Sequence, residues 1–381
     1  MGRAELRVGF SDSLIVSRPT ATTATSSSYA TALLAGADSF WVPDHLNNLF
    51  PRALWQEQYT GLAKIAPAAD AFMEPWTMLG RLTARNRLGR MQLGIGVTDT
   101  GRRNPAVTAQ AAATVHLLSR GRAILGIGPG EREGNEPYGV DWTRPVARFE
   151  EAMATIRALW DANGALVNRD SEFFPLRNAV FDVPPFRGTR PPIWIAAHGP
   201  RMLRAAGRYG DGFFPAFPHP PQEYARRLDI VRSAASDAGR DPDAIVPAMW
   251  FTIATGRTRD DVDEILNSNI AKAGGLLAPD EVYARHGARH PLGAGFSGAQ
   301  DILPHAWDED TALRLVGQVP PAVVREIILS GTPTEIVDRV AEWRDHGLRH
   351  VVIADLSQAG PKAKASAALA TLQALRKLRK L

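Results

Sequence analysis

The stretch Phe40–His45, with the sequence FWVPDH, decides how the rest of the chain is interpreted. It ends an apolar strand that begins at Asp38, and it continues into a proline, an acid and an imidazole. A continuous apolar strand is typical of a parallel sheet that is buried on both faces. In barrels of alternating strands and helices, catalytic groups lie at the mouth, directly after the strands. We therefore predict a parallel barrel with Asp44 and His45 at its rim, although a plain strand-ending turn would also explain the pair.

Eight segments with the composition of buried strands alternate with helical segments along the 381 residues. The strands are expected at Leu6–Phe10, Asp38–Val42, Met91–Val97, Arg122–Ile127, Pro192–Ala197, Gly212–Phe214, Val246–Thr255 and His350–Asp355. This alternation favours a closed (β/α)8 barrel, an α/β fold with one domain over residues 1–381, rather than an open sheet. Helices are expected at Tyr29–Ala37, Glu74–Arg85, Asn104–Ser119, Arg144–Asp161, His198–Tyr209 and from about Pro361.

Two stretches between these elements are too long for plain connections. Ser17–Ser28 is small and polar, and we predict an active-site loop there. Ala273–Val319 is rich in glycine and histidine and precedes the last strand. We predict that this insertion is a lid or a surface for a partner.

Composition excludes several classes of function. The chain has no cysteine, which excludes disulfides, thiolate metal sites and a cysteine nucleophile, and which is compatible with a cytoplasmic protein. The opening Met1–Arg7 lacks the apolar core of a signal peptide, and no run approaches the ~20 apolar residues of a membrane span. No basic stripe with interleaved aromatics suggests nucleic-acid binding. The basic segment Leu369–Leu381 is either the last barrel helix, with cations at its negative end, or a peripheral contact with an anionic membrane.

Three glycine-containing motifs follow predicted strands. Gly126–Glu131 (GIGPGE) does not match a dinucleotide fingerprint, because its third glycine position is occupied by Glu131 and its proline lacks an N–H. It either brings backbone close to a flat ring or a phosphate, with Glu131 as an acid or base, or it is a tight turn into a helix. Gly94–Val97 (GIGV) is either bare backbone for a ligand or ordinary packing at a strand end. Ala196–Arg201 (AAHGPR) is either an anion site at a helix start or a simple helix start.

No metal site is expected. His286 and His290 are four residues apart, but a glycine lies between them and a proline follows. No carboxylate is placed as a third ligand, so solvated loop histidines are the better interpretation.

Taken in order, these segments resemble the bacterial luciferase-like superfamily, and within it the branch that uses the deazaflavin coenzyme F420. The resemblance spans nearly the whole chain. It is carried by Ala37–His45, Asn104–Val107 with Ala109–Gln110, Leu125–Glu131 with Asn135–Glu136, and Ile195–Pro200. More closely, the chain is similar to reductases of long-chain wax-lipid ketones.

The resemblance implies roles for individual residues. His45 would transfer the proton, and Glu131 would be a second acid–base group. The positions matching coenzyme-binding residues are Asp44, Gly96, Val97, Thr98, Gly130, Asn135, His198, Gly199 and Arg201. Gly96-Val97 falls where the family has a non-prolyl cis peptide behind the ring.

The chain also departs from relatives that act on a sugar phosphate. Their tryptophan after the histidine is replaced by Leu49-Phe50, and their phosphate-binding lysine after the sixth strand is replaced by the lysine-free segment Ala216–Pro220. An apolar substrate is therefore favoured, with contacts expected from Phe214, Phe217 and Trp250. We expect a homodimeric, F420-dependent ketoreductase of a lipid ketone. An FMN-dependent monooxygenase and a non-catalytic barrel that binds a cofactor or lipid are the alternatives.

Overall fold

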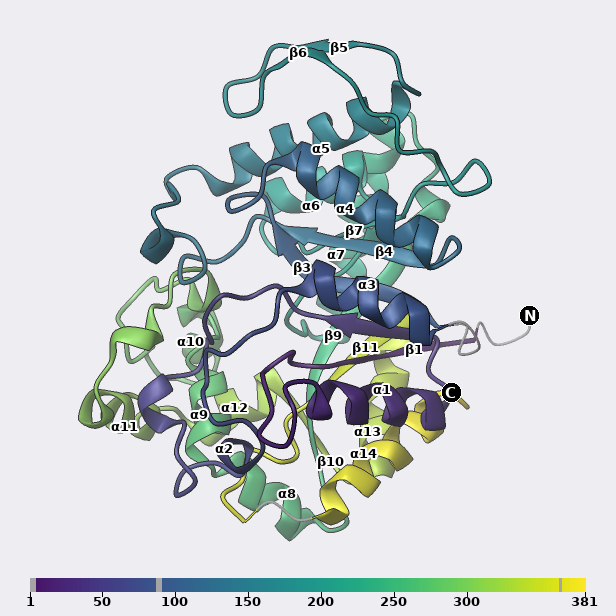
Figure 1. Ribbon diagram of the computed structural model, residues 1–381. Helices are drawn as coiled ribbons and strands as arrows, with labels where there is room; N and C mark the ends of the chain where they lie inside the picture. The colour runs from purple at the N-terminus through teal and green to yellow at the C-terminus, as the bar shows by residue number, and fades with distance from the viewer. Residues whose placement is uncertain (1–4, 87–90, 363–364) are drawn as a thin grey trace.

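The computed structural model describes residues 5–86, 91–362 and 365–381, and a closed barrel of eight parallel strands lies at its centre (Figure 1). The barrel strands, in order around the sheet, are β1 (Arg7–Ser11), β2 (Ser39–Val42), β3 (Gln92–Asp99), β4 (Ala123–Gly128), β7 (Ile193–Ile195), β8 (Gly212–Phe213), β9 (Val246–Thr255) and β11 (His350–Asp355). The barrel closes where β11 pairs with β1, from Arg7 opposite His350 to Ser11 opposite Ala354. The predicted (β/α)8 fold is confirmed, and each predicted strand end lies within 2 residues of its observed position.

Helices form the outer layer of the barrel. They are α1 (Thr23–Ala35), α3 (Pro75–Arg85), α4 (Pro105–Leu118), α5 (Pro145–Asp161), α6 (Pro200–Tyr209), α7 (Pro221–Asp237), α8 (Arg259–Leu266), α13 (Pro333–Asp345) and α14 (Ala365–Leu378). The start of α4 follows its sequence signals, because the side chain of Asn104 accepts from the N–H of Ala106 at 2.9 Å and Pro105 has no N–H that would need an acceptor. None of the helices in the described ranges is both long and apolar enough to cross a membrane.

The first helix begins earlier than predicted. The prediction of a loop over Ser17–Ser28 is wrong from Thr23 onward, because α1 starts there. Serine and threonine are weak helix formers, since their hydroxyls compete for backbone groups. Here the fully buried Thr25 donates to the carboxylate of Asp12 at 2.6 Å, which fixes the first turn from outside the helix.

Aromatic rings fill the interior of the barrel. Trp41 lies 5.1 Å from Trp194 and 4.9 Å from Phe214 between ring centroids. Gly94 leaves the room for these rings, since a Cβ there would lie 2.3 Å from the ring of Trp41. Burying about 200 Å² per ring at about 25 cal/mol per Å² contributes about 5 kcal/mol each. The strands are therefore buried on both faces, as their composition predicted.

Some elements were not expected from the sequence. The short strand β10 (Ile328–Gly331) pairs with the end of β9, and β5 (Val167–Arg169) forms an antiparallel pair with β6 (Leu176–Ala179) outside the barrel. Short 3-10 turns, η1 (Arg52–Leu54), η2 (Glu136–Tyr138), η3 (Pro242–Ala244), η4 (Gly298–Gln300) and η5 (Pro304–Ala306), connect other elements. These short segments show no periodic pattern that distinguishes them from the loops around them.

The long insertion before the last strand is largely helical. It contains η4, η5, α10 (Asp280–Arg285), α11 (Glu309–Gly317) and the end of α9 (Asn269–Gly275), and α12 (Pro321–Ile327) follows it. These helices share a second apolar core with η1 and α2 (Leu62–Ile65), which come after β2. In Figure 1 the helices α9, α10 and α11 gather on one side of the barrel, away from the C-terminus.

The basic end of α14 lies at the opposite end of the barrel from His45. Its Arg379 pairs with Asp38, just before β2 begins, at 3.5 Å, and Arg376 donates to the carbonyl of Leu34. The predicted start near Pro361 adjoins residues 363 and 364, which lie outside the described part, and the helix is described from Ala365. A membrane contact here would not be next to the barrel mouth.

Candidate active site at the barrel rim

Asp44 is buried directly after β2 and is held by charged neighbours. Arg103 donates to both of its carboxylate oxygens, at 3.1 and 3.2 Å, and the hydroxyl of Thr98 donates at 2.6 Å. Burial opposes the charged form, but Arg102 and Arg103 outweigh it and lower the pKa of Asp44. Asp44 is therefore an ionised structural anchor for the segment that carries His45.

The two arginines were not predicted as site residues. Arg102 is 10% exposed, pairs with Asp99 at 2.6 Å and donates to the backbone carbonyl of Asp44 at 2.7 Å. They follow β3, which pairs with β2, so the rim segments of the two strands meet. The sequence did contain a signal for these arginines, because β2 and β3 were predicted as consecutive strands and the residues after them should meet at the rim.

His45 lies at the mouth with its ring partly exposed. Its Nδ1 lies 3.1 Å from Oε1 of Glu133, its side chain keeps 22% of its exposure, and its ring faces Phe72 at 5.8 Å. Burial disfavours the imidazolium, but the hydrogen bond and charge of Glu133, with the charge of Glu131, raise the pKa of His45. The two carboxylates therefore favour the protonated form of the imidazole.

Glu131 and Glu133 reach the same point from the segment after β4. One donor atom from each of His45, Glu131 and Glu133 lies within 4.8 Å of the others. Burial, and then the negative charge of Glu133, raise the pKa of Glu131 to about 7, while His45 acts in the opposite direction. Glu133 was missed, although it stands two residues after the predicted Glu131.

The predicted ring-binding segment forms an irregular part of β3. The peptide between Gly96 and Val97 is cis, and the pairing of β3 with β4 shifts register between Ile95 and Thr98. Thr98 bonds to Asp44, so this segment adjoins the anchor of the site.

Gly130 and Asn135 shape the loop that carries Glu131. Gly130 has φ +93°, and a Cβ there would lie 2.9 Å from both Asn135 and Asp99, so glycine is required. The amide of the fully buried Asn135 donates to the carbonyl of Glu131 at 2.8 Å and to Asp99 at 3.2 Å. These contacts orient the loop, and any contact with a coenzyme stays a prediction.

The predicted anion loop lies at the start of α6. The ring nitrogens of His198 are both engaged, since Nε2 accepts from the N–H of Ala216 at 3.3 Å and Nδ1 lies 3.1 Å from His219. Burial and Arg227 lower the pKa of His198 to about 4, so it is neutral at pH 7. A coenzyme contact through His198 would therefore use its ring face.

The start of α6 is open around Gly199, and Arg201, the first arginine of the helix, pairs with Glu150. Apart from its chain neighbours, no heavy atom of the described residues lies within 4 Å of a Cβ built on Gly199, which caps the helix. Arg201 is 54% exposed and pairs with Glu150 at 2.5 Å. A phosphate at this helix start would compete with Glu150 for Arg201.

The three aromatic residues that were predicted to contact the substrate differ in how deeply they are buried. Phe214 is 2% exposed and lies among the interior rings. Half-buried Trp250 lies behind Gly96, and half-buried Phe217 faces His198 at 6.0 Å. Contact with a substrate stays a prediction for all three.

The His286 and His290 side chains do not converge on one point. Nε2 of His286 bonds to Glu326 at 2.7 Å, and Nε2 of the buried His290 bonds to the carbonyl of Leu276 at 3.1 Å. The interpretation of both as solvated loop histidines is wrong for His290, which is 3% exposed and packs against Tyr283 and Phe296.

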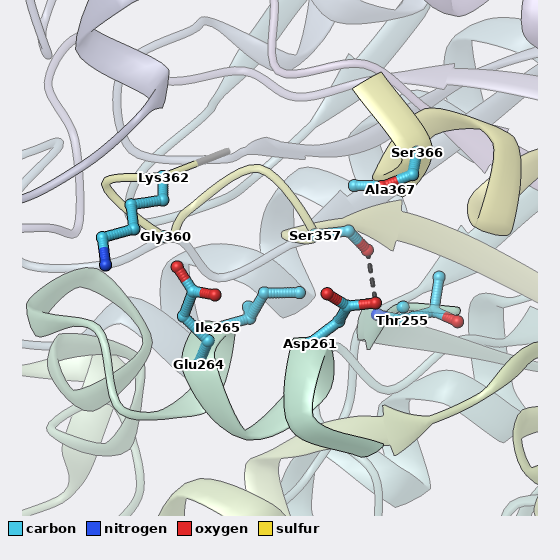
Figure 2. Close-up of a pocket in the computed structure, with 10 residues that line it drawn as sticks. Thr255, Asp261, Glu264, Ile265, Ser357, Gly360, Lys362, Ser366 and Ala367 are labelled. Atoms are coloured by element: carbon cyan, nitrogen blue, oxygen red, sulfur yellow. Dashed lines mark hydrogen bonds between the residues drawn. The ribbon is translucent and has the colours of Figure 1, made fainter. Parts of the chain in front are cut away.

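A small pocket lies beside the ends of β9 and β11, between α8 and the start of α14, and its lining includes none of the site residues described above (Figure 2). There the N–H of Thr255 donates to Oγ of Ser357 at 2.9 Å. Its volume of about 20 Å³ has room for a water molecule but not for a coenzyme ring. Lys362 and Ser366 flank residues 363 and 364, outside the described part, so we assign no site to this pocket.

An imidazole and two carboxylates that meet at the mouth of a closed parallel barrel are groups capable of acid–base chemistry. A family model described as "Luciferase-like monooxygenase" matches residues 27–350, and the chain belongs to this family. The chain is 66% identical over 351 residues to the phthiodiolone/phenolphthiodiolone dimycocerosates ketoreductase of Mycobacterium sp. (strain JLS), and the match covers 92% of each chain. Family and relative together make this protein an oxidoreductase.

Solved structures have the same fold. An F420-dependent secondary alcohol dehydrogenase in complex with an F420-acetone adduct matches with a TM-score of 0.74 and 18% identity, over 98% of each chain. A riboflavin lyase with modified FMN and riboflavin matches with a TM-score of 0.68 and 16% identity, over 99% of this chain and 92% of the other. At these identities the likeness extends to the fold.

Proposed function

We propose that this protein reduces a ketone of a long-chain lipid, of the phthiodiolone type, to the alcohol, with a hydride from reduced coenzyme F420. The observation that carries the proposal is the protonatable His45 at the rim of a chain so similar to a named ketoreductase. Ketone reduction needs one hydride at carbon and one proton at oxygen. The imidazole of His45 supports the proposal as the source of that proton.

The rim fits a coenzyme that offers hydrogen-bond donors. Among the described residues, buried oxygens of Asn47, Thr100 and Asn135 have no hydrogen-bond partner, and such groups usually find one. The amide N–H of a deazaflavin ring and the hydroxyls of its side chain are donors of this kind. When bound, reduced F420 would supply the hydride, and Gly96–Thr98, Gly130, Asn135 and the start of α6 would hold it.

The side chains then have separate tasks. His45 donates a proton from Nε2 to the carbonyl oxygen as the carbon receives the hydride, since Nδ1 is engaged by Glu133. Asp44, fixed by Arg103, anchors the segment that places the imidazole. Glu131, with a pKa near neutrality, is the alternative proton donor.

The insertion is proposed as the lid over the lipid. It touches both loops of the site, since Asn47 donates to Nδ1 of His305 at 3.2 Å and the N–H of Arg132 donates to the carbonyl of Gln300 at 2.9 Å. Half-buried aromatics, among them Phe72 and Trp307, pack against the same apolar core. Covering an apolar chain at this surface would gain about 25 cal/mol per Å² buried.

A titration of the protein with F420 and with FMN, side by side, tests the coenzyme. We expect F420 to bind and FMN to bind much more weakly. The family description and the riboflavin lyase structure favour an FMN-dependent monooxygenase as the second candidate. Submicromolar affinity for FMN without binding of F420 would replace the first proposal with the second.

The prediction about the substrate compares a lipid ketone with a sugar phosphate. With reduced F420, we expect turnover of phthiodiolone-type lipid ketones in detergent and none of glucose 6-phosphate, because Ala216–Pro220 offers no lysine to a phosphate. The absorbance change on coenzyme oxidation and product analysis measure both. Turnover of the sugar phosphate with inert lipid ketones would contradict the proposal.

Three further expectations stay predictions. They are the homodimer, a cytoplasmic location and a peripheral membrane contact through the end of α14. The pairing of Arg379 with Asp38 leaves fewer free cations for that contact than the sequence suggested.

A further inference from the structure

Glu133 is the most completely buried carboxylate at the rim. It is 0% exposed, and its Oε1 lies 3.1 Å from Nδ1 of His45, which stands 88 residues away in the sequence. Within the described ranges its second oxygen has no hydrogen-bond partner. Burial of a carboxylate costs several kcal/mol unless it is paired, so its position requires a partner such as His45.

The hydrogen bond fixes which nitrogen of His45 carries a proton. A carboxylate only accepts, so Nδ1 of His45 must be the donor. The neutral imidazole then has an unprotonated Nε2, and the imidazolium has a transferable proton on Nε2. Rotation of the ring would break this bond, so Glu133 also sets the direction of Nε2.

We propose that Glu133 is a positioning residue for His45: it keeps the proton on Nδ1 and directs Nε2 toward the reacting carbonyl. This inference rests on the proposed reaction, in which His45 is the acid. When Nε2 gives its proton to the carbonyl oxygen, the imidazolium becomes the neutral Nδ1–H form, and its hydrogen bond to Glu133 is preserved. The step therefore needs no rearrangement of the ring.

The charges around His45 support this role. Glu133 and Glu131 face the imidazole and favour its cation, while Arg102 opposes it. Arg102 is itself held by Asp99 and by the backbone of Asp44, so its charge is largely compensated. Phe72 covers the ring from the apolar side. Removing the charge of Glu133 should thus lower the pKa of His45.

The test is Glu133→Gln, with Glu136→Gln as the matched control on the same loop. Glu136 is 46% exposed and pairs with Arg132 at 2.7 Å, away from His45. Glutamine keeps the size of Glu133 but can accept or donate, so it no longer imposes the Nδ1–H form. We expect at least a tenfold loss of ketone reduction, within the ~10²–10⁴ that general acid catalysis contributes, with unchanged coenzyme affinity. The pH at which activity falls should shift downward, and Glu136→Gln should behave as wild type.

Nitrogen NMR of His45 tests the inference without any substrate. In wild type at high pH we expect the Nδ1–H tautomer, and in Glu133→Gln a lower titration midpoint and a mixture of tautomers. Wild-type protein alone decides the matter if the variant does not fold, since a predominant Nε2–H tautomer would overturn the proposal. A failed ketone assay with the expected tautomer would refute the reaction and leave the role of Glu133 intact.

The metal content of the purified protein is the remaining check. The donor atoms of His45, Glu131 and Glu133 are close enough to hold a divalent cation instead of a shared proton. We expect no stoichiometric zinc. One equivalent of zinc, lost in Glu133→Gln, would overturn the proposal, because a cation would then occupy the place of the Nδ1–H bond.

Discussion

Replacing His45 with alanine is expected to slow the reduction of a lipid ketone by at least about a hundredfold, the lower end of what a general acid contributes. The coenzyme dissociation constant should change by only a few fold, because Nδ1 of His45 is engaged by Glu133 and the coenzyme is proposed to be held by other residues. Single-turnover reduction, followed through coenzyme absorbance, measures the step directly.

His346→Ala is the control for this variant. His346 ends α13, before β11 begins, and is therefore at the far end of the barrel from the mouth. Wild-type single-turnover rates in His45→Ala would assign the proton to another group, and Glu131→Gln would then be the variant expected to fail. Because an acid must be protonated, the wild-type rate should fall as pH rises through the raised pKa of His45.

Replacing Asp44 with asparagine is expected to lower the free energy of unfolding by about 3 kcal/mol, the scale for breaking a buried ion pair from one side. Asparagine keeps the shape of Asp44 but leaves the charge of Arg103 compensated only by Glu74, at 3.0 Å. Urea unfolding at pH 7 measures the difference between the two proteins.

The effect of Asp44 should depend on pH in a defined direction. Its pKa is lowered in the folded protein, so its contribution is complete above the unfolded value of about 3.9 and is lost as pH falls through the folded value. The difference between wild type and Asp44→Asn should therefore persist from neutral pH to about pH 4 and shrink below it.

Asp170→Asn provides the matched control. Asp170 pairs with Arg177 at 2.7 Å but is 96% exposed, and such surface pairs contribute at most about 1 kcal/mol. If Asp44→Asn lost no more stability than Asp170→Asn, the ion pair between Asp44 and Arg103 would contribute no more to stability than an exposed surface pair.

The sequence alone predicted the barrel because its strands carry their own signal. Apolar runs such as Ser39–Val42 must be buried on both faces. In a barrel, the helices cover the outer face of each strand and the interior side chains cover the inner face. The polar residues after each strand must then lie at the rim. That rule placed Asp44 and His45 correctly at the mouth without knowledge of any partner.

What the sequence could not give were the contacts between distant segments. The start of α1 depends on the bond from Thr25 to Asp12, and β10 exists because β9 offers it an edge. Neither leaves a local periodicity. Propensity and pattern describe a segment by itself, whereas these elements are stabilised by their neighbours.

The same division applies to the site. Sequence and resemblance pointed to His45 and Glu131, but only the tertiary structure placed Glu133 against Nδ1 of His45. β3 lies between β2 and β4 in the sheet, and closure of the barrel mouth brings the loops after β2 and β4 together. The strand pattern therefore determined which residues reach the rim. The packing of the loops decided which of them form hydrogen bonds with one another. These interactions depend on distances of a few ångströms, and the spacing of residues in the sequence does not contain such distances.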